Sequence, residues 1–228
     1  MSIVDNYHKI RDEIPNHVTI VLAAKTRTPN EIEEAITAGA TDIGENCIQE
    51  AEQMHNALGE KAKKIRWHMI GHLQKNKVNK ALPIFDVIQT IDSLKLTETI
   101  SKRAKKVYSV YIEINSGREP QKSGVMPENA EELIRQISRL ENIKIEGLMT
   151  MGPRFGNPED ARPFFKETKK LFDYIDSLDL QNVEMKELSM GMSNAYKIAI
   201  EEGSTMIRPG SIIFGQRSQC NIDTAESE

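Results

Sequence analysis

The sequence has little that would mark a secreted, membrane-bound or basic protein. Its 228 residues include only two cysteines, Cys47 and Cys220, which lie far apart and lack the spacing of metal ligands. Aromatic residues make up 5% of the chain, and no apolar run is long enough to span a bilayer. The first residues mix acids with bases, so we expect neither a signal peptide nor an anchor. These absences favour a cytoplasmic protein with reduced thiols.

The sequence also lacks an excess of positive charge. The formal net charge is −4, which gives no electrostatic reason to expect nucleic acid or an anionic membrane as a partner. A content of 39% apolar and 28% charged residues is typical of a globular protein, and no linker or low-complexity tract divides the chain. We therefore predict one domain over residues 1–217, followed by a polar C-terminal tail over residues 218–228.

Short apolar, β-branched runs alternate along the chain with longer stretches of helical periodicity. Eight runs are expected to be strands: Val18–Ala24, Thr41–Gly44, Ile65–Ile70, Val87–Thr90, Val107–Asn115, Ile143–Met149, Glu187–Met190 and Thr205–Arg208. Apolar residues recur at three- and four-residue steps in the stretches Asn30–Ala38, Ile48–Leu58, Ser93–Lys105, Glu128–Leu140 and Pro158–Leu178. Strands and helices in alternation predict a parallel sheet.

Eight such units predict an α/β fold, a single (β/α)8 TIM barrel with an extra helix at the N-terminus. An open, doubly wound sheet is the alternative. In a barrel, ligands bind at the carboxyl ends of the strands. The residues that end or follow the apolar runs are therefore the candidates for function.

Lys25 follows the first apolar run and has two interpretations. Most lysines lay their methylene stem along apolar surface and keep the charged head in water. A lysine that is desolvated at the end of a buried strand instead has a lowered pKa, and its neutral amine can form a Schiff base. Ala23 and Ala24 would leave room for a ligand beside it.

Ser193, Gly210 and Ser211 follow the last two apolar runs and offer hydroxyls and flexible backbone N–H groups. Such groups bind phosphate, and a phosphate site after strands seven and eight recurs in TIM barrels. Taken singly, these residues are also ordinary turn residues. Arg208 lies on the last run, where it either pairs with a carboxylate at the rim or faces the nitrogen of a heteroaromatic ring.

Two further patterns have structural explanations. His68 and His72 are four residues apart, but an extended chain would hold them roughly 13 Å apart, so we expect no zinc site. Asn46 and Gln49 fit an N-cap residue and its partner three residues later at the start of a helix.

Six ordered motifs then resemble those of the pyridoxal-phosphate homeostasis proteins. The motifs are "AAKT" around Lys25, "IGENCIQE" at 43–50, "WHMIGHLQKNK" at 67–77, "GLMTMGP" at 147–153, "ELSMGMSNAY" at 187–196 and "MIRPGSIIFGQR" at 206–217. That family is similar in fold to the N-terminal barrel of alanine racemase, a fold-type III barrel for pyridoxal 5′-phosphate (PLP).

The resemblance implies a set of roles for particular residues. Lys25 would carry PLP as a covalent aldimine. Ser193, Gly210 and Ser211 would hold the phosphate, and Arg208 would face the pyridine nitrogen. Asn46 and Met69 would lie near the cofactor.

Three positions depart from the family pattern, namely Ala24 in place of a common serine, Ala195 in place of a common aspartate and Pro209 in place of a common aliphatic residue. Pro209 removes one backbone donor beside the phosphate, which changes the expected hydrogen bonds but not the location of the site.

An arginine at the ring nitrogen limits the chemistry of the cofactor. A cation about 4 Å from that nitrogen contributes on the order of 4 kcal/mol at an effective dielectric of about 20, or roughly three pKa units. The ring should stay unprotonated, which makes it a poor electron sink. A racemase with such a ring needs a second acid/base, which in alanine racemase comes from a C-terminal domain that we do not expect after Arg217.

The resemblance therefore predicts a monomeric PLP-binding protein that acts in intracellular PLP (vitamin B6) and amino-acid homeostasis. We expect that it is not an enzyme and that PLP-dependent apoenzymes are candidate partners. A small PLP-dependent amino-acid racemase or lyase is the alternative. A Schiff-base aldolase that uses Lys25 without a cofactor is a third hypothesis.

Overall fold

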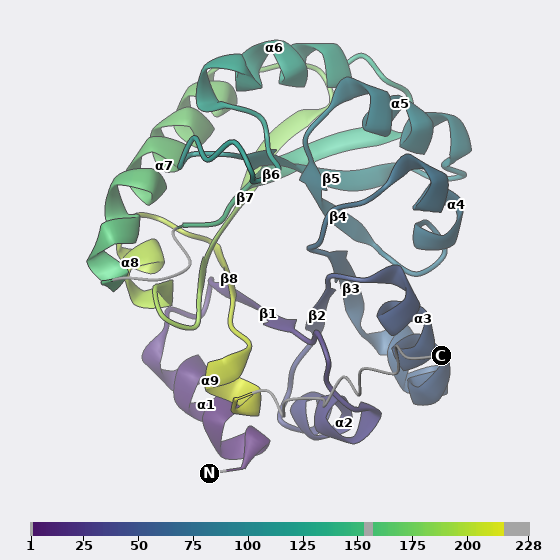
Figure 1. Ribbon diagram of the computed structural model, residues 1–228, viewed down its shortest axis with the longest axis vertical. Coiled ribbons are helices and arrows are strands. Elements are labelled where there is room, and N and C mark those ends of the chain that lie inside the picture. The colour runs from purple at the N-terminus through teal and green to yellow at the C-terminus, as the bar shows by residue number, and fades with distance from the viewer. Residues whose placement is uncertain (1, 153–156, 217–228) are drawn as a thin grey trace, which may run out of the picture.

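The strands close into a barrel. The computed structural model describes residues 2–152 and 157–216, and in these ranges eight parallel strands form a ring surrounded by helices (Figure 1). The strands follow one another in chain order, and β1 pairs with β8 to close the ring. Their bounds are β1 (Thr19–Ala23), β2 (Asp42–Glu45), β3 (Arg66–Met69), β4 (Val87–Ile91), β5 (Tyr108–Ile114), β6 (Ile143–Thr150), β7 (Val183–Met192) and β8 (Met206–Arg208). The predicted TIM barrel is confirmed, and the open sheet is wrong.

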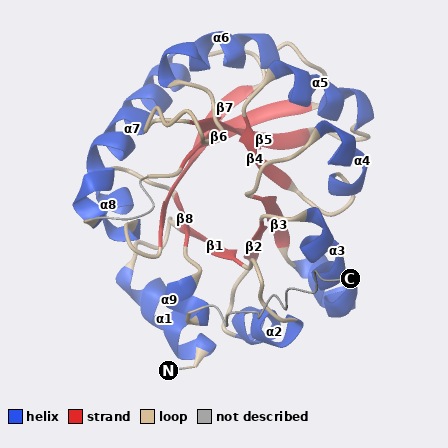
Figure 2. Cartoon of the chain, in the orientation of Figure 1, coloured by secondary structure: helices blue, strands red, loops and turns tan. Residues whose placement is uncertain are grey.

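The helices lie outside the ring of strands (Figure 2). Those of the described ranges are α1 (Ile3–Glu13), α2 (Pro29–Thr37), α3 (Ile48–Leu58), α4 (Val78–Ala81), α5 (Leu94–Arg103), α6 (Pro127–Ile137), α7 (Arg162–Ser177), α8 (Tyr196–Glu201) and α9 (Ser211–Phe214), with 3₁₀ turns η1 (Gly59–Lys64), η2 (Lys75–Lys77) and η3 (Pro158–Ala161). The extra N-terminal helix is α1, which packs against α2 and α9.

Most element boundaries lie within three residues of the prediction, and two elements differ more because of local chain chemistry. The single helix expected over Pro158–Leu178 is divided into η3 and α7. Pro163 explains the division, because proline has no N–H and is tolerated only in the first turn of a helix. Strand β7 begins at Val183, four residues before the expected start, since exposed Glu184 extends the strand beyond its apolar part.

The first turns of α2 and α3 differ in how they are capped. At α2 the Thr28 hydroxyl accepts the Glu31 N–H, and the Glu31 carboxylate accepts the Thr28 N–H. The expected cap of α3 by Asn46 is wrong. The N-cap residue there is Cys47, whose backbone is extended, and its thiol donates to Gln49 Oε1 at 3.0 Å.

Apolar side chains form two separate clusters. The larger one fills the space between the strands and the helices. The smaller one draws side chains from five different strands and lies inside the ring: Val21, Val87, Tyr111, Met149 and Met206. The barrel is therefore a packed core, and a ligand can enter only at its mouth.

Some expectations concern residues beyond those described. The boundary at residues 217 and 218, the tail, Pro153 of the "GLMTMGP" motif, and Cys220 all lie outside the described ranges. Of the helices within those ranges, none combines the length and the apolar character needed to cross a membrane.

Candidate functional site

Seven residues were predicted to form a site, and the barrel brings them to one end. Because all the strands are parallel, their carboxyl ends meet at the same mouth. Lys25 and Asn46 follow β1 and β2, and Met69 ends β3. Ser193 follows β7, Arg208 ends β8, and Gly210 and Ser211 come directly after it.

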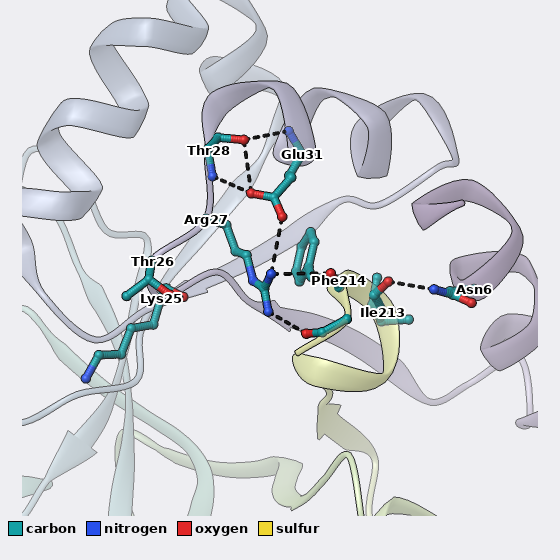
Figure 3. A network of polar contacts seen from close by, with 9 residues as sticks. Asn6, Lys25, Thr26, Arg27, Thr28, Glu31, Ile213 and Phe214 are labelled. Atoms are coloured by element: carbon teal, nitrogen blue, oxygen red, sulfur yellow. Dashed lines mark hydrogen bonds and ion pairs between the residues drawn. The ribbon is translucent and has the colours of Figure 1, made fainter. Parts of the chain in front are cut away.

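Lys25 lies in the turn after β1 and is exposed. The next residue, Thr26, has a left-handed φ of 64°, a strained value for a β-branched residue. Its N–H donates to Glu50 Oε2 at 3.0 Å, and its hydroxyl donates to the Lys25 carbonyl at 2.6 Å. Figure 3 shows the Lys25 side chain extending away from Arg27. Of the two interpretations of Lys25, the one with its head in water agrees with the structure, because the turn carries the lysine beyond the buried part of the strand.

Arg27 connects this turn to α9. Its guanidinium donates to the Phe214 carbonyl at 3.3 Å, to the Gly215 carbonyl at 2.7 Å and to Glu31 Oε1 at 3.2 Å (Figure 3). It also lies 5.2 Å from the centre of the Phe214 ring, a cation–π distance. Only 7% of the Arg27 side chain is exposed; its bonds to Glu31 and to the Phe214 carbonyl are partly buried, and the bond to the Gly215 carbonyl is exposed. They fix the end of α9 against the segment that carries Lys25.

Ser193 is bonded to the loop after β8. Its Oγ accepts the N–H of Gly210 at 3.0 Å and the N–H of Ile212 at 3.4 Å. Gly191 enables this placement, because it has a φ of 90° and a Cβ there would lie 2.5 Å from Ala199 Cβ. Two backbone donors thus converge on one oxygen at the mouth of the barrel.

Arg208 is buried, with 4% of its surface exposed. Its Nη1 donates to Ser189 Oγ at 2.5 Å, and its Nη2 donates to the Thr150 carbonyl at 2.8 Å. Burial lowers the pKa of Arg208 to about 10, an effect that the nearby Glu113 opposes. The guanidinium is therefore charged at neutral pH, and its bonded partners are neutral groups.

Two buried carboxyl groups near the mouth were missed by the sequence analysis. Glu45 ends β2 and Glu113 lies near the end of β5, and each has an Oε2 atom with no hydrogen-bond partner among the described residues. Burial, with a smaller effect of Glu50, raises the pKa of Glu45 to about 8. Burial and Asp92 raise the pKa of Glu113 to about 7, although Arg208 lowers it. The sequence signal that could have identified both groups is an acidic residue within an otherwise apolar strand.

Asn46 and Met69 are placed differently from each other. Asn46 is exposed, and its backbone packs so closely on Gly71 that a Cβ at Gly71 would lie 2.2 Å from the Asn46 carbonyl oxygen. Met69 is buried, and strand alternation puts its side chain on the face opposite that of His68, toward the helices. The structure does not bring Met69 together with Ser193 or Arg208, and its role stays a prediction.

The two histidines have separate surroundings. His68 is buried and bonded to Asp42, whereas His72 is about half exposed and lies 3.7 Å from Asp92. Across the described ranges, no group of three or more potential ligands is arranged to hold a metal ion.

Comparison with known proteins places the chain in a family. Residues 2–218 match the family model described as alanine racemase, N-terminal domain. The pyridoxal phosphate homeostasis protein of Aquifex aeolicus is 41% identical over 205 residues, which cover 89% of this chain and 88% of that protein. The chain belongs to the pyridoxal phosphate homeostasis protein family. The family member from Bos taurus is 35% identical over 210 residues, or 87% of this chain and 77% of that protein. The predicted resemblance is confirmed, and both of these relatives are named for a role, not for a reaction.

Solved structures resemble this chain over nearly its whole length. PipY of Synechococcus elongatus without PLP has a TM-score of 0.88 and 29% identity, covering 94% of this chain and 100% of that one. The same protein with PLP bound gives a TM-score of 0.86 and 28% identity over the same shares. Alanine racemase of Clostridium difficile shares the fold, with a TM-score of 0.80, 16% identity and coverage of 96% of this chain but 58% of the racemase.

Proposed function

We propose that this protein binds PLP at the mouth of the barrel and takes part in intracellular PLP and amino-acid homeostasis. The observation that carries the proposal is the convergence of the Gly210 and Ile212 N–H groups on one oxygen, next to the strand that holds the charged Arg208. Membership of the family, and the PipY structure with PLP bound, support the same conclusion.

The groups on the loops after β7 and β8 fit a phosphate. Ser193 Oγ accepts two backbone N–H groups of the loop after β8, so its own hydroxyl proton can be donated to a phosphate bound beside that loop. The Ser193 and Ser211 hydroxyls add donors. Pro209 has no N–H to offer, and its carbonyl is already bonded to the Ala23 N–H at 2.9 Å. The donor lost at Pro209 is therefore compensated by the hydroxyls.

Lys25 supplies the covalent link. The Lys25 amine would hold PLP covalently, because a lysine amine can condense with an aldehyde with loss of water. The exposure of Lys25 suits this step, because the aldehyde can reach the amine directly from solvent. Asn46 and Met69 remain predicted neighbours of the cofactor.

The buried cation of Arg208 argues against a strong catalytic role. Bound PLP is a poor electron sink when its ring nitrogen is unprotonated, and a buried cation opposes the protonation of that nitrogen. We therefore assign the protein to holding, buffering and delivering PLP as a cytoplasmic monomer, with PLP-dependent apoenzymes as recipients. Its barrel domain comprises residues 1–217.

A small racemase or lyase is the second candidate, because Glu113 is a buried carboxyl with a free oxygen and a pKa near neutrality. Such a group can act as an acid/base at neutral pH. Exchange of the α-proton of L-amino acids in deuterated water separates the two functions. We expect almost no exchange. Fast exchange that disappears in Glu113→Gln would establish the enzyme instead.

Titration with PLP, followed by absorbance, tests binding itself. The wild type should develop the band of a lysine imine, and Lys25→Ala should not. Lys105→Ala is the matched control, because Lys105 is an exposed lysine that precedes β5 at the opposite end of the barrel. Absence of the band in the wild type at saturating PLP would overturn the proposal, as would its persistence in Lys25→Ala.

A further inference from the structure

A continuous chain of polar side chains crosses the inside of the barrel. Its members come from five strands, β2, β3, β4, β7 and β8, and each is buried: Asp42, His68, Gln89, Ser189 and Arg208. We call it the interior hydrogen-bond chain. It is unexpected in a barrel whose remaining interior includes a cluster of apolar side chains, because buried polar groups are costly unless they are all paired.

Each link of the interior hydrogen-bond chain is short. Asp42 Oδ1 lies 2.9 Å from His68 Nε2, and His68 Nδ1 lies 2.9 Å from Gln89 Nε2. Gln89 Oε1 accepts the Ser189 hydroxyl at 2.7 Å. Ser189 Oγ in turn accepts Arg208 Nη1 at 2.5 Å. The chain thus joins a carboxylate in β2 to the guanidinium at the end of β8.

The position of the proton on His68 follows from its neighbours. Burial lowers the pKa of His68, so the ring is neutral at neutral pH and has one donor and one acceptor. Burial alone would raise the pKa of Asp42, but hydrogen bonds from His68 and Thr41 hold it below its ordinary value. A carboxylate only accepts, so His68 Nε2 carries the proton and Nδ1 is the acceptor.

The remaining directions are then determined. Because His68 Nδ1 accepts, Gln89 presents its NH₂ group to the ring and its carbonyl oxygen to Ser189. Ser189 uses its only proton on that carbonyl, so its lone pairs face Arg208. Every hydrogen bond in the interior hydrogen-bond chain therefore points from the Arg208 cation toward the Asp42 anion.

We propose that Gln89 and Ser189 are positioning residues for Arg208, which hold its guanidinium in one orientation at the ligand site by connecting it to His68 and Asp42. This inference rests on the proposed function, in which Arg208 faces the ring nitrogen of PLP. Gln89 is suited to the role because a carboxamide has both a donor for His68 and an acceptor for Ser189.

The direction of the chain can be tested without PLP, by ¹⁵N NMR of the histidine side chains in the apoprotein. We expect His68 of the wild type to be neutral with its proton on Nε2. In Gln89→Glu the carboxylate has no proton for Nδ1, so His68 should become doubly protonated. A proton on Nδ1 in the wild type would overturn the inference, as would an unchanged His68 in folded Gln89→Glu at a pH where the new carboxyl is ionised.

The effect on Arg208 can be tested by PLP titration of Gln89→Leu and Ser189→Ala. Ser189→Ala removes a bond to the charged Arg208, and Gln89→Leu removes the acceptor that orients Ser189, so each should weaken PLP binding on the order of ten-fold and move the pH midpoint of the absorbance band. Thr90→Val is the matched control, because Thr90 is a buried neighbour of Gln89 whose hydroxyl donates instead to the Gly71 carbonyl. Its PLP affinity and midpoint should stay unchanged.

The outcomes separate this inference from the proposed function. If the wild type fails to bind PLP, the proposed function is wrong, and the NMR result still decides the direction of the chain. If the wild type binds PLP and the folded variants bind it with the same affinity and midpoint, Gln89 and Ser189 do not position Arg208. If Gln89→Leu does not fold, PLP titration of Ser189→Ala and NMR of Gln89→Glu still test the inference.

Discussion

Gly210 and Ser193 lie 17 residues apart in the sequence and are joined by a hydrogen bond of 3.0 Å from the Gly210 N–H to Ser193 Oγ. The bond fastens the loop after β7 to the loop after β8. A second N–H, that of Ile212, is directed at the same oxygen. The two loops therefore act as one unit, and a ligand phosphate held there would contact both.

Ser193→Ala should reduce the affinity for PLP on the order of ten-fold, because it removes a hydroxyl from the phosphate and unties the two loops. Binding of pyridoxal, which has no phosphate, should change little. Parallel absorbance titrations with both compounds measure the effect. Ser101→Ala, which removes a hydroxyl bonded to the Glu141 carbonyl on the helical layer, is the control. An equal loss for both compounds would argue against a phosphate contact at Ser193.

Arg27→Met should loosen α9. The substitution removes a cation from the last carbonyls of the helix, which stabilises such ends by about 0.3–2 kcal/mol depending on burial. Hydrogen exchange of the Phe214 and Gly215 amides, which donate to Gly210 and Ser211, should become faster. Weaker binding of PLP should accompany it, since α9 begins within the proposed phosphate site.

Arg103→Met is the matched control for Arg27→Met, because Arg103 also donates to a backbone carbonyl, that of Lys75, but is exposed. It should leave both exchange and PLP binding unchanged. If the α9 amides of Arg27→Met exchange at the wild-type rate, Arg27 does not hold the helix in solution.

The barrel could be predicted because each strand is a short apolar run followed by a helical stretch. The runs at Val87 and Ile143 began at the residues where β4 and β6 begin. Short elements such as α4 and α9 were not predicted, because four residues are too few to display a helical period.

The site could be predicted only in part. Strand ends gave the positions of Lys25 and Arg208, since parallel topology alone brings such residues to one mouth. The sequence left an exposed and a desolvated Lys25 both open, because the choice depends on a left-handed turn at Thr26, a residue type that rarely adopts one. Nor could the partners of Gln89, which come from strands 21 and 100 residues away.

Gly71→Ala should destabilise the fold by about 1–3 kcal/mol, the usual cost of overpacking a buried position. Its Cβ would lie 2.2 Å from the Asn46 carbonyl oxygen, and backbone cannot move aside as a side chain can. Gly117→Ala is the control, because its Cβ would meet only the flexible carboxylate of Glu119 at 3.0 Å. Urea unfolding measures both. Equal stability of the two variants would contradict the close packing of Asn46 on Gly71.

Glu45 should make the protein less stable as the pH rises. Burial raises its pKa from 4.5 to about 8, with a smaller contribution from Glu50, so the folded state binds the proton more tightly than the unfolded state. The free energy of unfolding must then fall as the pH rises from about 4.5 to about 8. Glu113, whose folded pKa is about 7, contributes a fall of the same sign over a narrower window.

Glu45→Gln isolates the first effect, because glutamine has the same shape but no proton to lose. Urea unfolding should show that the wild type loses much of its free energy of unfolding between pH 5 and pH 8. The variant should lose clearly less, because only the contribution of Glu113 remains. Glu52→Gln, on the exposed face of α3, should lose as much as the wild type. If Glu45→Gln loses as much stability between pH 5 and pH 8 as the wild type does, the Glu45 carboxyl must gain water or another partner when it ionises. Its Oε2 atom would then not stay without a hydrogen bond, as it is among the described residues.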